Sequence, residues 1–168
     1  SVKDVFEWLR WGGVQRNMRI LGTLSILNLS PPLDMHPKWF AGSVAYTMAK
    51  YTMSMCVLGM AQEFADKGIA VNALWPRTAI ATAAVQNHLG GDEIMKLSRN
   101  VDIMADAAYE ILIKDSKSFS GNFCIDDLVL HEAGVTDFSK YANVPFCELM
   151  PDFFVPDDTP VPDEVKNS

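Results

Sequence analysis

The sequence predicts an α/β fold built on a parallel sheet, because short apolar runs alternate with helical patterns along the chain. Compact apolar runs at 24–29, 69–74 and 120–125 each end in polar or turn-forming residues, and helical patterns at 43–67 and 102–114 separate them. Buried parallel strands joined by right-handed helical crossovers produce this order. Three strands are nevertheless few for a complete domain of this kind.

The composition indicates one globular domain and excludes several classes of partner. The chain has 168 residues, of which 49% are hydrophobic, and this is enough for a real core. Its formal net charge of −7 argues against binding to nucleic acid or to an anionic membrane surface. No apolar run reaches the roughly 20 residues that a membrane span needs.

The three cysteines, Cys56, Cys124 and Cys147, are widely separated and form no Cys-x-x-Cys motif. Neither a zinc site nor a disulfide framework is therefore indicated, and no metal site is expected. A reducing, intracellular compartment fits this pattern best.

The first element in chain order is a short apolar helix that Gly12-Gly13 ends, followed by a basic connector. Residues 1–23 as a whole receive no functional assignment. The first strand follows at 24–29 and stops at Ser30-Pro31-Pro32. Ser30 thus lies at the carboxyl end of a strand, where open α/β sheets bind ligands, although a lone serine there more often only starts a turn.

The longest helix is expected at 43–67, with Ser43 as its N-cap and Gly68 as the residue that ends it. Apolar residues, four of them methionine, occur nearly all round it. A helix of this kind must be covered on more than one side. One side can pack on the sheet, and the other predicts a homo-oligomer through helix 43–67.

Tyr46 and Lys50 lie four residues apart within this helix, so both side chains project from one face, one turn apart. A neighbouring ammonium favours the phenolate and lowers the tyrosine pKa from about 10 toward the working pH. A tyrosine tuned in this way can pass a proton to or from a substrate oxygen. Taken alone, the short Tyr-x-x-x-Lys pattern is more often a surface pair on an ordinary helix.

The second strand, 69–74, ends in a polar turn that begins at Trp75-Pro76-Arg77-Thr78. One or two short helices broken by Gly90-Gly91 are expected over 79–98, and an amphipathic helix over 102–114.

The third strand, 120–125, is expected to close at Asp126-Asp127, and a short helix is expected near 128–133. From residue 151 the chain is rich in Pro and Asp and is typical of an extended linker or tail. The expected organisation is therefore a domain at 24–150 and a tail at 151–168.

Several motifs in this order resemble the C-terminal half of a short-chain dehydrogenase/reductase, over roughly residues 24–155. The segments that carry the resemblance are Ile26-Leu-Asn-Leu-Ser-Pro-Pro, Ala45-Tyr-Thr-Met-Ala-Lys, Val71-Asn-Ala-Leu-Trp-Pro-Arg-Thr-Ala-Ile, Asp102-Ile-Met-Ala-Asp-Ala-Ala-Tyr and Gly121-Asn-Phe-Cys-Ile-Asp. The resemblance implies the C-terminal half of a Rossmann-type, doubly wound parallel sheet.

The resemblance also implies roles for individual residues. Tyr46 would be the general acid/base, Lys50 would hold the nicotinamide ribose and lower the Tyr46 pKa, and Ser30 would bind the substrate carbonyl or hydroxyl. The cofactor would be NAD(P), with no preference between NAD and NADP, and the implied cofactor-binding residues are Tyr46, Lys50, Pro76, Arg77, Thr78 and Ile80.

Two departures from the family pattern shape the expectation for activity. Ser30 lies sixteen residues before Tyr46, a slightly longer spacing than usual. The family's Gly-rich first turn, its Asn-Asn-Ala-Gly strand and its helix asparagine have no counterpart here. The glycines of that turn and a helix N-terminus make the pyrophosphate site. We therefore expect the N-terminal nucleotide-binding half to be missing and the chain alone to be inactive.

Two functions of different class follow. The first is an NAD(P)-dependent oxidoreductase that reduces a carbonyl or oxidises a secondary alcohol on a lipid-like small molecule. The second is a non-catalytic fragment that acts as a dimerisation or interaction module through helix 43–67. The resemblance implies a mitochondrial or peroxisomal setting, with a cytoplasmic one also open.

Overall fold

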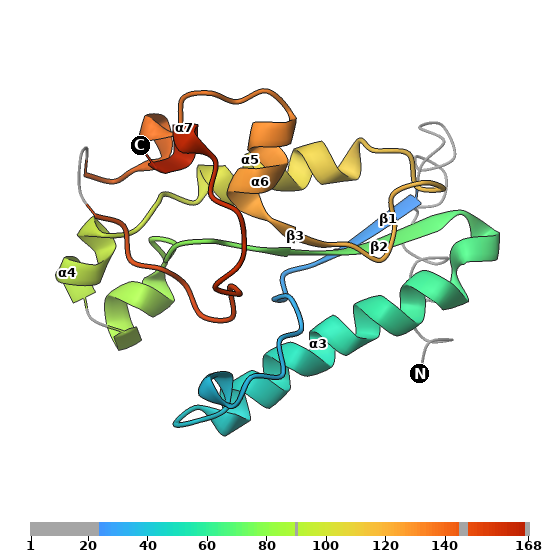
Figure 1. Ribbon diagram of the computed structural model, residues 1–168, viewed down its shortest axis with the longest axis horizontal. Helices are drawn as coiled ribbons and strands as arrows, with labels where there is room; N and C mark the ends of the chain where they lie inside the picture. The colour runs from blue at the N-terminus through green and yellow to red at the C-terminus, as the bar shows by residue number, and fades with distance from the viewer. Residues whose placement is uncertain (1–23, 90, 145–147, 167–168) are drawn as a thin grey trace.

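A three-stranded parallel sheet forms the centre of the computed structural model, which describes residues 24–89, 91–144 and 148–166 (Figure 1). Its strands are β1 (Leu24–Asn28), β2 (Ile69–Trp75) and β3 (Phe123–Ile125), in the order β1-β2-β3. Both strand pairs, β1 with β2 and β2 with β3, are parallel. The predicted α/β class and the three predicted strands are thus confirmed, whereas the expectations for residues 1–23 lie outside the described residues.

Helices cover both faces of this sheet (Figure 1). On one face α3 (Val44–Glu63) packs against β2, and the shared core consists of Val57, Ala61, Phe64, Ile69, Val71 and Ala73. On the other face lie α5 (Asp102–Leu112) and α6 (Asp126–Glu132), whose core includes Leu74, Ile103, Ala107, Ile111, Val129 and Leu130. Because side chains alternate along β2, this central strand supplies apolar residues to both layers.

The long helix matches its prediction at both ends. It starts after Ser43, ends at Glu63 and continues into a 3-10 helix, Ala65–Lys67, that Gly68 stops with a φ of 66°. No other described helix covers its second side, so the predicted cover by another subunit stays a prediction. Its buried face is Thr47, Tyr51, Ser54, Val57 and Ala61, while Val44, Met48, Met55 and Leu58 are exposed. Only the face turned toward the sheet is packed there.

The remaining helices are short. They are a 3-10 helix at Pro37–Trp39, a π-helix at Val85–Leu89, α4 (Gly91–Lys96), a 3-10 helix at Ser139–Tyr141 and α7 (Asp163–Lys166). The helix predicted near 128–133 begins earlier, because Asp126 and Asp127 form the first turn of α6 rather than the end of β3. Acidic side chains are favourable in a first helical turn.

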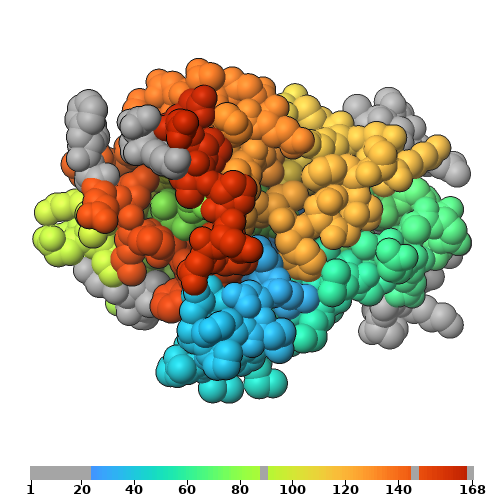
Figure 2. Space-filling model, in the orientation of Figure 1, coloured from blue at the N-terminus to red at the C-terminus, as the bar shows by residue number. Residues whose placement is uncertain are grey.

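The segment 151–166 has little regular structure, in keeping with its Pro- and Asp-rich composition, but it packs on the domain. Phe154 is 0% exposed, and Val165 belongs to the core on the α5–α6 side. Figure 2 shows this segment, in red, between the blue loop after β1 and the orange region of α6. Its large apolar side chains, which composition alone does not reveal as core residues, hold it there.

None of the helices within 24–89, 91–144 and 148–166 has the length and apolar character needed to cross a membrane.

Candidate active site

Tyr46 and Lys50 project from the first turns of α3 toward the carboxyl end of β2. The Lys50 Nζ atom lies 6.0 Å from the centroid of the Tyr46 ring and 5.3 Å from that of Trp75, the last residue of β2. The Tyr46 side chain is 48% exposed, so its phenol is open to a ligand. The predicted shared face is therefore present, and it lies at the sheet edge where α/β folds bind ligands.

Ser30 follows β1 at the same edge of the parallel sheet. Its backbone N–H donates to the Asn28 carbonyl at 3.1 Å, and its side chain is fully buried. The Ser30 Oγ atom has no hydrogen-bond partner among the described residues. A buried hydroxyl without a partner costs free energy, and such groups in native proteins call for an explanation. A ligand oxygen at this edge would provide the missing partner.

A hydrogen bond ties the loop after β1 to α3. The Ser54 hydroxyl, buried one turn after Lys50, donates to the Pro31 carbonyl at 2.7 Å. Ser54 is itself in the packed face of α3, so the residue next to Ser30 is held against the helix that carries Tyr46 and Lys50. That Ser30 and Tyr46 approach within reach of one substrate oxygen stays a prediction.

The four residues predicted to contact the cofactor after β2 differ in where their side chains go. Thr78 is buried, and its Oγ1 atom has no hydrogen-bond partner in the described part of the chain. Ile80 packs into the core between the sheet and α5, and Pro76, four residues earlier, is also buried. Of these four, Thr78 is the one whose polar side-chain atom is left for a ligand.

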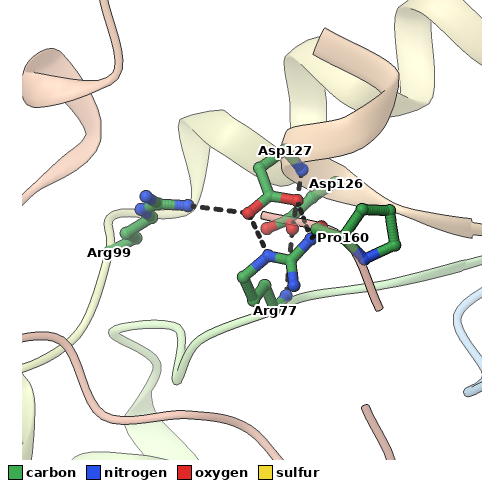
Figure 3. A network of polar contacts seen from close by, with 5 residues as sticks. All are labelled: Arg77, Arg99, Asp126, Asp127 and Pro160. Atoms are coloured by element: carbon green, nitrogen blue, oxygen red, sulfur yellow. Dashed lines mark hydrogen bonds and ion pairs between the residues drawn. The ribbon is translucent and has the colours of Figure 1, made fainter. Parts of the chain in front are cut away.

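Arg77 is turned into the protein, where its guanidinium forms a buried ionic network (Figure 3). Its Nε and Nη2 atoms donate to the two carboxylate oxygens of Asp127, and Nη2 also donates to the Pro160 carbonyl at 2.8 Å. Arg99 lies 3.7 Å from the same carboxylate. The Arg77 side chain thus joins the turn after β2, α6 and the C-terminal segment, and its predicted contact with the cofactor stays a prediction.

Asp126 completes this network through the backbone. One of its carboxylate oxygens accepts from the N–H groups of Arg77 and Asp127, at 2.9 and 2.8 Å. Its other oxygen has no partner among the described residues. Burial, with the neighbouring Asp127 charge as the second cause, raises the pKa of Asp126 to about 7. The network therefore holds a carboxyl group that titrates close to neutral pH.

The pKa of Tyr46 is shifted in the direction opposite to the sequence prediction. Partial burial raises it above its ordinary value, and the negative charge of Asp152 raises it further. The expectation that Lys50 would lower this pKa took account of one neighbour on the same helix. It could not include the carboxylate that the C-terminal segment brings to the site.

Sequence reasoning missed two residues of this site, Asp152 and Phe154. Phe154 stacks on the Tyr46 ring with a centroid distance of 5.8 Å, and it also contacts Trp75 and Tyr51. Burial raises the pKa of Asp152 to about 6. The only sequence signal was a Phe-Phe pair in a Pro- and Asp-rich stretch, which does not indicate a contact with a helix 100 residues earlier.

Comparisons with known proteins place this geometry in context. No family model matches the chain. The chain is 59% identical over 130 residues to hydroxysteroid dehydrogenase-like protein 2 from Bos taurus and 58% identical over 130 residues to the Homo sapiens protein of the same name. Each match spans 77% of this chain but only 30% of the relative's own length.

Solved structures of dehydrogenases are likewise similar to this chain over part of their length. The chain superposes on a short chain dehydrogenase from Mycobacterium thermoresistibile with a TM-score of 0.75 and 50% identity, covering 87% of this chain and 51% of that one. A protein from Xanthomonas campestris gives a TM-score of 0.75 and 46% identity, over 80% of this chain and 48% of the other. The described fold thus corresponds to about half of each of these two proteins.

Proposed function

Because the matched residues of this chain are part of a short-chain dehydrogenase/reductase domain, we propose that they form the proton-transfer side of an NAD(P)-dependent oxidoreductase site. The reaction is the reduction of a carbonyl, or the oxidation of a secondary alcohol, on a lipid-like small molecule. One observation carries the proposal: the Lys50 ammonium lies over the rings of Tyr46 and Trp75 at the carboxyl end of β2.

Tyr46 is the general acid/base of the proposed reaction. Its raised pKa keeps the phenol protonated at neutral pH, so it can donate a proton to a carbonyl oxygen that is becoming an alcohol. In the reverse direction the phenolate form of Tyr46 would accept the alcohol proton, so the raised pKa favours the reduction. The Lys50 ammonium, 6.0 Å from the Tyr46 ring centroid, stabilises the negative charge that remains on the phenol oxygen after the proton has left.

Ser30 and Thr78 supply the polar groups that fit a substrate and a nicotinamide. Each has a buried hydroxyl without a hydrogen-bond partner among the described residues. Ser30 would donate to the substrate oxygen that Tyr46 protonates, and Thr78 and Lys50 would hold the nicotinamide end of the cofactor. When bound, the nicotinamide supplies or accepts the hydride. The described residues fit this end of a dinucleotide, and the sequence contains no G-x-x-x-G-x-G segment for its pyrophosphate.

Aromatic side chains beside Tyr46 support an apolar substrate. Trp39, Tyr51, Trp75, Phe153 and Phe154 form ring contacts centred on Phe154 next to the phenol. Tyr51, Trp75 and Phe154 are buried in this cluster, so the half-exposed Phe153 and the partly exposed Trp39 supply its aromatic surface. Aromatic surface of this kind binds apolar ligands and orients them with few polar groups. A lipid-like carbonyl compound matches this environment better than a charged metabolite does.

The test uses this chain joined downstream of a Gly-rich strand–turn–helix unit, called here the upstream-extended protein. Tyr46→Phe keeps the stacked ring and should lose about 10²-fold or more in turnover, while nicotinamide-cofactor binding, followed by fluorescence, is retained. The matched control is Tyr109→Phe, because Tyr109 is exposed on α5, on the opposite face of the sheet. Equal turnover of the Tyr46→Phe and Tyr109→Phe proteins would refute the role of Tyr46.

A second function, self-association through α3, is favoured by a separate observation. Val44, Met48, Met55 and Leu58 are exposed along one helix, and contiguous apolar surface marks interaction sites. In this alternative, the chain is a dimerisation or interaction module without catalytic activity. An upstream-extended protein that neither binds a nicotinamide cofactor nor turns over a carbonyl, but that dimerises, would favour this function.

A further inference from the structure

Asp152 is fixed against the carboxyl end of β2 by its backbone. The segment that contains it runs antiparallel to the residues after β2, with a bridge between Thr78 and Pro151. On one side of that bridge the Ala79 N–H donates to the Met150 carbonyl at 2.8 Å, and on the other the Asp152 N–H donates to the Arg77 carbonyl at 2.9 Å. Asp152 is therefore held opposite Arg77, which follows the last residue of β2, Trp75, by two positions.

The residues that follow Asp152 bring it to the Tyr46–Lys50 pair. The Trp75 indole donates to the Phe153 carbonyl at 2.7 Å, and Lys50 lies over that same indole. Phe154 then stacks on the Tyr46 ring. Asp152 thus belongs to a segment that contacts Trp75, beside Lys50, through Phe153 and contacts Tyr46 through Phe154.

The charges at this place interact. Asp152 is partly buried, and burial raises its pKa to about 6. The Phe153 N–H, which donates to its carboxylate at 2.6 Å, and the Lys50 charge both act to lower that pKa. The Asp152 charge in turn raises the pKa of Tyr46. The charged and titratable groups that act on Asp152 are therefore Lys50 and Tyr46, both from α3.

We propose that Asp152 is a positioning residue of the Tyr46–Lys50 pair: its segment is held against Trp75 and Tyr46, and its carboxylate attracts the Lys50 ammonium toward the carboxyl end of β2. The proposal rests on the function proposed above and adds a third residue to the site. Asp152 acts through Lys50 and Tyr46 and makes no contact with substrate in this account.

The pH dependence follows from the Asp152 pKa of about 6. Above that pH the carboxylate is charged, attracts Lys50 and opposes ionisation of Tyr46. As the pH falls through about 6, the carboxyl group becomes neutral and both effects disappear. The arrangement of the pair is therefore expected to change as the pH passes through about 6.

The first test measures the ionisation of Tyr46 in the full chain and needs no turnover. The Tyr46 titration is obtained as the difference in ultraviolet absorbance between each protein and its Tyr46→Phe partner. Asp152→Asn removes the charge but keeps an oxygen to accept from the Phe153 N–H, and it should move the Tyr46 titration to lower pH. Asp152→Glu should restore it toward the original pH.

The matched control is Asp157→Asn, which removes one charge from the same segment. Asp157 pairs with Lys38 at 2.5 Å, and its side chain is 88% exposed. The control should leave the Tyr46 titration unchanged. An unchanged Tyr46 titration in folded Asp152→Asn protein, or an equal shift in both variants, would overturn the proposal.

A second measurement avoids the Asp152 substitution in case that variant fails to fold. Carbon NMR of the Asp152 carboxyl group in the unsubstituted chain should give a midpoint near pH 6, and Lys50→Met should raise it, because an attracting positive charge is lost. A midpoint that does not respond to Lys50→Met would contradict the proposal.

Turnover separates this proposal from the proposed function. In the upstream-extended protein, kcat/KM should change with a midpoint near pH 6 that Asp152→Asn removes and Asp152→Glu retains. If no turnover is found with any carbonyl compound while the Tyr46 titration still responds to Asp152→Asn, the proposed function fails and the coupling of the three residues stands. If turnover occurs and its pH profile is the same in Asp152→Asn, the positioning role fails alone.

Discussion

The rings of Tyr46 and Phe154 stack with their centroids 5.8 Å apart and their planes inclined by 21°. The contact joins α3 to the C-terminal segment and limits the directions in which the Tyr46 phenol can point. Phe154 also adopts a φ of 69°, in the left-handed region that non-glycine residues rarely occupy. Its ring contacts thus hold a backbone conformation that is unfavourable on its own.

Removal of the Phe154 ring should destabilise the domain strongly. Phe154→Ala is expected to lower the free energy of unfolding by about 3–5 kcal/mol, because a fully buried aromatic side chain is lost from the cluster. Denaturant unfolding followed by tryptophan fluorescence measures this. Phe153→Ala is the control, and since Phe153 is half exposed, its substitution should lower the free energy of unfolding by only about 1 kcal/mol.

Phe154→Gly should be more stable than Phe154→Ala by about 1 kcal/mol, because glycine adopts the positive φ without strain.

Arg77 substitutions should affect stability far more than cofactor affinity. Arg77→Ala leaves the Asp127 carboxylate buried without its bidentate partner, and breaking such a pair lowers the free energy of unfolding by about 3–5 kcal/mol. Lys96→Ala, which removes an exposed ion pair with Glu93, should cost less than about 1 kcal/mol. If Arg77→Ala instead weakened nicotinamide binding in a protein of unchanged stability, the structural role assigned to Arg77 would be wrong.

The buried Asp126 carboxyl should make stability depend on pH. Its folded-state pKa of about 7 lies above the ordinary value of 3.8, so the folded state binds this proton more tightly than the unfolded state does. The contribution of Asp126 to stability is therefore fully present below pH 3.8 and is lost as the pH rises through about 7. Asp126→Asn keeps the oxygen that accepts from the two backbone N–H groups and removes the charge.

In unfolding experiments at a series of pH values, Asp126→Asn should gain stability relative to the unsubstituted chain as the pH rises from 4 to 8. The expected difference at the upper end is a few kcal/mol. Asp137→Asn is a suitable control, because Asp137 is a fully exposed carboxylate whose pKa is lowered by its hydrogen bonds from Ser139. A difference between the proteins that does not vary over this pH range would argue against the raised Asp126 pKa.

Charged substitutions on the exposed apolar face of α3 should abolish self-association. Leu58→Lys is expected to shift an upstream-extended protein from dimer to monomer in light scattering, because a charge cannot be buried in an apolar interface without a partner. Ile113→Lys is the matched control, since Ile113 is also exposed but follows α5 on the opposite face of the sheet. A monomer at micromolar concentration before any substitution would count against the interface.

The 168-residue chain alone should show no oxidoreductase activity. The residues proposed to contact the nicotinamide, Lys50 and Thr78, would hold only one end of a dinucleotide, and this contact would be too small to offset the entropy lost on association. An upstream extension that contains a Gly-rich strand–turn–helix unit should restore activity that depends on Tyr46. Carbonyl-dependent oxidation of NAD(P)H by the chain alone would contradict this expectation.

The sequence was sufficient for features that depend on local pattern. The three strands, the ends of α3 and the placement of Tyr46 and Lys50 on one face all follow from apolar periodicity, from Gly68 and from four-residue spacing. Features that depend on contacts between distant segments could not be predicted. The Arg77 side chain contacts Asp127 fifty residues later, and burial, with the Asp152 charge as the second cause, raises the Tyr46 pKa that was expected to be lowered. Both contacts require the tertiary fold, and neither residue type indicates its partner.

The attachment of the C-terminal segment also bears on how the domain is completed during synthesis. Trp75 donates to the Phe153 carbonyl, Arg77 to the Pro160 carbonyl, and Lys38 pairs with Asp157. The N-terminal residue of each pair leaves the ribosome first. The contacts of α3 and β2 with the C-terminal segment therefore form only after residues 153–160 have been synthesised. A nascent chain that ends before Phe153 would present Trp75 and Tyr46 without their aromatic cover, as a binding surface for chaperones.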